Sequence, residues 1–165
     1  TAATASTAYA GIPLTHRLKS SAVAFVTGHE DPAKPAQSID YSALAAFPGT
    51  LVFYMGLHRV GEICAALIEA GLDQTTPAAV ISRGTCSSQQ TVSATLKTLA
   101  EAVIDAELSA PSLIVVGDCV VISFEQASPR SFDKWKNPLN MYINMNNQGD
   151  GVPTVPEYEI TCSNH

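Results

Sequence analysis

Three glycine-containing segments are the parts of this sequence best suited to contact a small ligand. They are Thr27–His29, Met55-Gly56 and Arg83–Thr85, and each directly follows a short apolar run. If those runs are neighbouring strands, the segments meet at the sheet edge where α/β proteins bind their ligands. Glycine also allows a ligand to approach the backbone closely. The spacing therefore predicts a ligand site at this edge, without identifying the ligand.

The side chains that usually carry nucleophilic or metal chemistry show no functional spacing. The four cysteines form no CxxC pair and no cysteine–histidine set with the spacing of zinc ligands, which argues against a zinc site. The sequence also lacks a GxSxG nucleophile elbow. Cys64 and Cys119 lie inside apolar runs, where we expect small buried hydrophobes and a reducing, cytoplasmic environment. We therefore predict neither a catalytic nucleophile nor a metal ion in this chain.

The elements that must position the three segments are strands and helices in alternation. Apolar runs predict strands over Ala22–Thr27, Thr50–Met55, Ala78–Ser82, Gln90–Ala94 and Leu113–Val116, with Cys119–Ile122 continuing the last one beyond Gly117. Helical spacing and end signals predict helices over Thr1–Tyr9, Asp40–Phe47, Val60–Ile68 and Leu96–Ile104. Continuous apolar strands separated by helices predict an α/β fold: a mixed, mostly parallel sheet with helices on both faces.

Composition limits the class of protein. The chain has 165 residues, of which 46% are hydrophobic and 15% charged, as in one globular domain with a sizeable core. No apolar run is long enough for a membrane span. A net charge of −6 argues against nucleic acid and acidic lipid as partners.

The composition changes near residue 122. All six asparagines lie between Asn137 and Asn164, in a stretch rich in proline and glycine with no sustained period. We expect residues 123–165 to form an irregular tail. Because the sequence begins at Thr1 without methionine or a signal-peptide pattern, we also expect it to be an interior piece of a longer protein.

Five motifs together carry a family resemblance. They are TAATASTAYAGIPLTHR, AVAFVTGHE, TLVFYMG, SRGT and PSLIVVGDCVVI. In order and spacing they resemble the C-terminal half of the uroporphyrinogen-III C-methyltransferases, within the tetrapyrrole methylase family. The resemblance implies that residues 1–21 end an N-terminal domain and its linker, that residues 22–122 form the C-terminal domain, and that residues 123–165 lie outside the match.

The resemblance also implies an activity. These enzymes use S-adenosyl-L-methionine to methylate uroporphyrinogen III twice, release S-adenosyl-L-homocysteine and form precorrin-2 for sirohaem and cobalamin. They work without a metal, as cytoplasmic homodimers. The glycine-rich cofactor loop and the proton-transfer residues of the family have no counterpart in this chain, so we expect an incomplete site and no turnover by the chain alone.

By the same resemblance, five residues contact the cofactor: Thr1, Ala2, Met55, Gly84 and Ser112. A soft, unbranched thioether suits contact with an adenine or a sulfonium, and small residues leave the ligand room. Without the resemblance, these would be ordinary residues of a helix start, a strand end and turns.

His16 and Arg17 are the candidates for binding the substrate. Uroporphyrinogen carries many carboxylates, and a guanidinium can pair bidentately with each. A linker arginine that caps helix carbonyls is the competing interpretation.

Two other functions stay open. One is a non-catalytic remnant that dimerises or senses the cofactor. The other is a methylase of the same fold that acts on a later corrin precursor, diphthine or ribosomal RNA. The acidic charge and the GIPLTHR string disfavour this last group.

Overall fold

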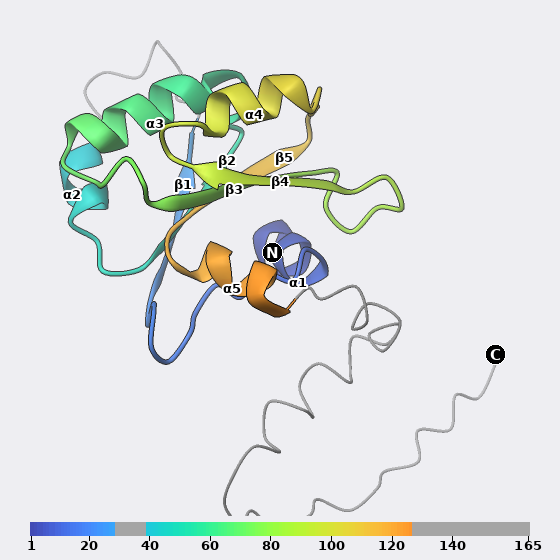
Figure 1. The fold of residues 1–165 in the computed structure, drawn as a ribbon, viewed down its shortest axis with the longest axis horizontal. Coiled ribbons are helices and arrows are strands. Elements are labelled where there is room, and N and C mark those ends of the chain that lie inside the picture. Colours follow the sequence, from blue (N-terminus) through green and yellow to red (C-terminus); the bar gives the residue numbers. More distant parts are fainter. Residues whose placement is uncertain (29–38, 127–165) are drawn as a thin grey trace, which may run out of the picture. The chain divides into compact units, whose positions relative to one another are not determined.

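A computed structural model describes residues 1–28 and 39–126 of the chain (Figure 1). Its helices are α1 (Ala2–Tyr9), α2 (Tyr41–Ala45), the 3-10 turn η1 (Leu57–Arg59), α3 (Val60–Glu69), α4 (Leu99–Asp105) and α5 (Cys119–Gln126). Its strands are β1 (Val23–Thr27), β2 (Thr50–Tyr54), β3 (Pro77–Ser82), β4 (Gln90–Thr95) and β5 (Ser112–Val116). His29 and the predicted tail from residue 127 onward lie outside the described residues.

The five strands form one mixed sheet in the order β1-β2-β5-β3-β4. Only β1 and β2 pair in parallel, while β5 runs antiparallel to both β2 and β3, and β4 runs antiparallel to β3. The predicted mixed sheet is confirmed, but the prediction that it is mostly parallel is wrong. The reason is the position of β5, which enters between β2 and β3 in the opposite direction to both.

Helices cover both faces of the sheet, as predicted. Figure 1 shows α3 and α4 on one side of the strands and α1 and α5 on the other. Alternate residues of β2 follow this division: Leu51 and Phe53 belong to the core beneath α3 and α4, and Val52 belongs to the core beneath α1. The central strands are therefore buried on both faces, which explains why they read as continuous apolar runs.

Helix α3 follows its sequence pattern closely. Val60, Ile63, Cys64 and Leu67 are buried on one face. The chain leaves the helix through Gly71, whose φ of +104° lies in the region that favours glycine. Burial also raises the pKa of the Cys64 thiol to about 11, so this cysteine stays protonated at neutral pH.

Two predicted elements differ from the structure. Cys119–Ile122 does not continue a strand but begins helix α5, which buries Cys119 and Val120 and runs to Gln126, past the predicted domain boundary at 122. Helix α4 begins at Leu99, so Leu96 is buried just before it, and Ile104 is 73% exposed instead of lying on the core face. None of the helices in the described part of the chain is long and apolar enough to cross a membrane.

Candidate functional site

One edge of the sheet brings the predicted ligand segments together. Because β1, β2 and β3 run in the same direction, their carboxyl ends lie at one edge, with the amino end of β5 between those of β2 and β3. Gly28, Met55-Gly56 and Gly84 follow these strand ends. The predicted arrangement of the three segments at one edge is therefore confirmed for the described residues.

A cavity of about 510 Å³ opens at this edge. Its lining comes from α1, the end of β2 with η1, the end of β3, and the start of β5: Ala2, Ser6, Tyr54, Met55, Leu57, His58, Ile81, Gly84, Ala110, Pro111, Ser112 and Leu113. Four of the five residues predicted to contact a cofactor are among them. The fifth, Thr1, is exposed and precedes helix α1, outside the lining.

Two hydrogen bonds hold the walls of the cavity in place. The backbone N–H of Ala3 donates to the Tyr54 hydroxyl at 3.2 Å, which fixes the start of α1 to the end of β2. This bond also satisfies one of the N–H groups that a helix start leaves free. On the opposite wall, the N–H of Arg83 donates to the carbonyl oxygen of Pro111 at 2.8 Å, which brings Gly84 beside the start of β5.

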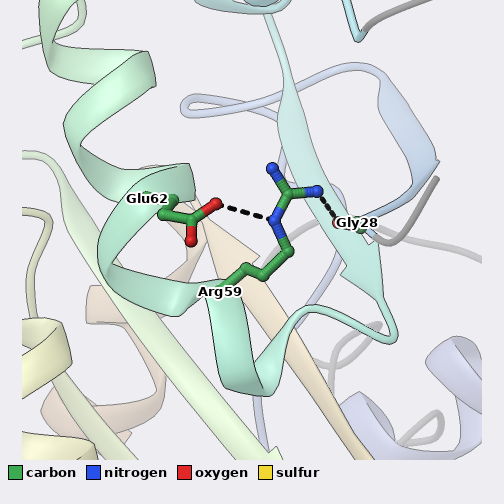
Figure 2. Close-up of polar contacts among 3 residues, drawn as sticks. All are labelled: Gly28, Arg59 and Glu62. Carbon is green, nitrogen blue, oxygen red and sulfur yellow. Dashed lines mark hydrogen bonds and ion pairs between the residues drawn. The ribbon is translucent and has the colours of Figure 1, made fainter. Parts of the chain in front are cut away.

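Gly28 and Gly56 allow the ends of β1 and β2 to approach closely. A Cβ added to Gly28 would lie 3.0 Å from the Cα of Gly56, and one added to Gly56 would lie 2.8 Å from the Cδ1 of Ile63. Figure 2 shows the side chain of Arg59 beside Gly28: its Nη1 donates to the carbonyl oxygen of Gly28 at 3.2 Å and its Nε pairs with Glu62 at 2.8 Å. These glycines therefore serve dense packing behind the cavity.

Met55 lies at the mouth of the cavity in an unusual backbone conformation. Its φ is +53°, a backbone conformation that residues other than glycine rarely adopt, and the residue is 64% exposed. Strain of this kind persists where the surrounding structure imposes it, and it gathers at binding sites. The conformation turns the chain from β2 into η1, which places His58 in the lining.

Gly84 packs directly against helix α1. A Cβ added to Gly84 would overlap the Oγ and Cβ atoms of Ser6 and lie 3.2 Å from its Cα. The sequence predicts that this glycine lets a ligand approach or, in the competing interpretation, forms a plain turn. The structure adds a second reason for a glycine here: no larger residue fits between the loop at Gly84 and helix α1, where α1 now lies.

Comparison with known proteins identifies the family. The sequence profile described as Tetrapyrrole (Corrin/Porphyrin) Methylases matches residues 1–100. The chain belongs to the tetrapyrrole methylase family.

Relatives of this tetrapyrrole methylase chain include biosynthetic enzymes of two lengths. It is 44% identical over 120 residues to an S-adenosyl-L-methionine-dependent uroporphyrinogen III methyltransferase of Methanosarcina barkeri, a match that covers 73% of this chain and 47% of the relative. It is 49% identical over 120 residues to siroheme synthase 1 of Klebsiella pneumoniae, which covers 73% of this chain and 25% of the relative. The chain thus spans about half, or a quarter, of the length of these relatives.

A solved structure agrees with the fold. Uroporphyrin-III C-methyl transferase from Thermus thermophilus, complexed with S-adenyl homocysteine, matches with a TM-score of 0.59 and 30% identity, over 71% of this chain and 50% of that one. The predicted tetrapyrrole methylase fold is therefore confirmed.

The residues predicted to bind substrate lie apart from the cavity of the tetrapyrrole methylase chain. His16 and Ser20 close a turn through two backbone hydrogen bonds, of 2.7 and 3.0 Å. Within the turn, His16 Nδ1 accepts from the N–H of Leu18 at 3.3 Å, and Arg17 is exposed. Neither His16 nor Arg17 lines the cavity.

Two polar lining residues of the tetrapyrrole methylase chain were missed from sequence. Ser6 lies one helical turn after Ala2, so a helical wheel of α1 would have placed both on one face. His58 lies three residues after Met55, within η1, and no periodic pattern marks it. The cavity is therefore lined by four predicted residues and by two that were missed: Ala2, Met55, Gly84 and Ser112, and Ser6 and His58.

Proposed function

We propose that this tetrapyrrole methylase chain binds S-adenosylmethionine in the cavity at the sheet edge. The observation that supports this most directly is the convergence of Ala2, Met55, Gly84 and Ser112. Their motifs alone mark them as cofactor contacts, they come from four segments far apart in sequence, and they line the same cavity. A chance set of four surface residues would not meet in this way.

The cavity suits a ligand of this kind. Its volume of about 510 Å³ falls within the range of small-molecule sites, and its walls are largely apolar with a few polar side chains. Ala2 and Gly84 would leave room for the nucleoside, and Met55 would lie against the adenine or the sulfonium. The bound cofactor supplies a methyl group already activated for transfer. The residues of this chain therefore serve to orient it and to exclude water on their side.

For the whole protein, we propose C-methylation of uroporphyrinogen III to precorrin-2, in sirohaem or cobalamin biosynthesis. The names of the relatives support this reaction. Arg17, exposed on its turn beside His16, is accessible for pairing with substrate carboxylates. A cytoplasmic homodimer is part of the same proposal.

Titration with S-adenosylhomocysteine, followed by NMR or calorimetry, tests the cofactor site. We expect a dissociation constant near the millimolar range, about 4 kcal/mol of binding free energy. We expect weak binding because Met55, which lines the cavity, is 64% exposed, so the cavity is open to water on that side.

A matched pair of variants locates the binding. Met55→Ala should weaken it, and Leu18→Ala should not, because Leu18 is also a large exposed apolar residue (82%) but does not line the cavity. Absence of binding at millimolar ligand, or equal effects of the two variants, would contradict the proposed cofactor site. Micromolar binding would instead show that this chain builds a complete site by itself.

A further inference from the structure

Helix α1 presents one buried hydroxyl to the cavity, that of Ser6. The residue is only 5% exposed and lines the cavity. Within residues 1–28 and 39–122, every fully enclosed side-chain nitrogen or oxygen has a hydrogen-bond partner. No hydrogen bond of Ser6 Oγ occurs among these residues, so its oxygen is not fully enclosed, and the opening beside it is the cavity.

Thr7, the next residue of α1, shows that a buried hydroxyl on this helix can be hydrogen-bonded within the chain. The Thr7 hydroxyl is also buried, and it donates to the carbonyl oxygen of Ala3 at 2.8 Å, with a second contact to that of Thr4 at 3.2 Å. The helix therefore satisfies one of its two buried hydroxyls and leaves the other without a partner among the described residues. A hydroxyl that opens onto the cavity finds its hydrogen-bond partner there, in a ligand or a bound water.

Packing restricts where the Ser6 hydroxyl can point. Its Cβ and Oγ lie against Gly84 so closely that no Cβ fits there. The nearby walls of the cavity come from β3 and the start of β5, where Ile81 pairs with Leu113 in the sheet and both are buried. Together with Pro111, these side chains form an apolar surface, and the Ser6 hydroxyl lies at its border.

An apolar surface with a hydroxyl at its border fits a flat heterocycle that carries polar atoms on its edge. The hydroxyl can both donate and accept, as the ring nitrogens, amino group and ribose hydroxyls of a nucleoside require. We propose that Ser6 is a further binding residue of this site and hydrogen-bonds the adenosine portion of the ligand. This inference rests on the proposed cofactor site and specifies which part of the cofactor lies against α1 and β3.

Ser6→Ala tests the proposal, because it removes the hydroxyl and keeps the Cβ that packs against Gly84. Thr4→Ala is the matched control, since it removes an exposed hydroxyl from the same helix outside the cavity. Two probes are titrated into the chain: S-adenosylhomocysteine, and 5′-methylthioadenosine, which keeps the adenosine but lacks the amino-acid portion. We expect Ser6→Ala to raise both dissociation constants by about three- to tenfold, as for one neutral hydrogen bond, and Thr4→Ala to raise neither.

The outcomes separate the two proposals. If the unmodified chain binds neither probe, the proposed cofactor site is wrong, and the role of Ser6 fails with it. If the chain binds both probes and Ser6→Ala changes neither constant, a water satisfies the hydroxyl and only the role of Ser6 is wrong. A loss confined to S-adenosylhomocysteine would also overturn it, because Ser6 would then contact the amino-acid portion. A circular dichroism melt of Ser6→Ala that matches the unmodified chain shows that the fold is intact.

Discussion

Substitution of Gly84 by alanine should destabilise the fold through its contact with helix α1. The added Cβ would overlap Ser6 Oγ and Cβ and lie 3.2 Å from Ser6 Cα. A side-chain rotation of Ser6 cannot relieve this contact, because its Cβ is also involved. Helix α1 would therefore have to move, although Ala3 and Ile12 are buried against the sheet and Ala3 is bonded to Tyr54. We expect a loss of about 2 kcal/mol of unfolding free energy, in the range observed for overpacked cores.

A double-mutant cycle with Ser6 tests this explanation. Ser6→Gly removes both overlapping atoms and leaves only the 3.2 Å contact with Cα. In that background, Gly84→Ala should cost less than about 0.5 kcal/mol, which gives a coupling energy of about 1.5 kcal/mol. Ser6→Gly itself should cost about 0.5 kcal/mol, the difference in helix propensity between the two residues.

Ser6→Ala is the control for this cycle, because it removes Oγ but keeps Cβ. Most of the loss of about 2 kcal/mol should therefore remain in the Ser6→Ala background. Urea denaturation followed by circular dichroism measures the unfolding free energy of all six chains. The urea midpoints are compared with one shared slope of unfolding free energy against urea concentration. The reasoning is refuted if Gly84→Ala has the same effect in all three backgrounds, or an effect below about 0.5 kcal/mol in the unmodified chain.

Two further predictions concern the backbone of Met55 and the chemistry of the cysteines. Met55→Gly should be more stable than Met55→Ala by about 1 kcal/mol in urea denaturation, because φ at this position is +53° and glycine adopts that angle without strain. A higher stability of Met55→Ala would contradict backbone strain at this position. Iodoacetamide at neutral pH should label the exposed Cys86 and leave Cys64 unmodified in the native chain, because Cys64 is buried and its pKa is raised to about 11. Mass spectrometry of the peptides checks this, and labelling of Cys64 at the rate of Cys86 would contradict it.

Local patterns predicted the elements whose type depends on neighbours in sequence. The spacing of Val60, Ile63 and Leu67 defined α3, and Asp40 was correctly placed at the start of α2, where its Oδ1 accepts from the N–H of Ala43 at 2.9 Å. The apolar runs at β2 and β3 were also correctly interpreted as strands. These features depend on side chains close together along the chain, so the sequence contains them directly.

The direction of β5 and the nature of α5 depend on long-range packing. Burial on both faces makes a strand apolar whether its neighbours are parallel or antiparallel, so composition does not distinguish the two. Cys119–Ile122 is a short apolar run, and periodicity does not separate a buried strand from one turn of a buried helix. Helix α5 exists because Cys119 and Val120 pack beneath the sheet, which no local pattern expresses.

The candidate site also contains residues that local sequence identifies and residues that it does not. Ala2, Met55, Gly84 and Ser112 were predicted through their motifs, and the cavity joins them. His58 lies in a 3-10 turn with no period, and Ser6 was hidden in a helix of small residues whose apolar face is weakly marked. Sequence therefore located the edge of the sheet but not the full set of side chains around the cavity.

The place of β5 in the sheet has a consequence for biosynthesis on the ribosome. The strand lies between β2 and β3, yet it is the last of the five to be translated. Until Val116 has left the ribosome, no strand pairing joins β1–β2 to β3–β4, and the inner edges of β2 and β3 stay unpaired. Such exposed edges favour association between nascent chains and recruitment of chaperones. Because Ser112 begins β5, the strand that joins the two halves also completes the cavity, so no shorter nascent chain carries the site.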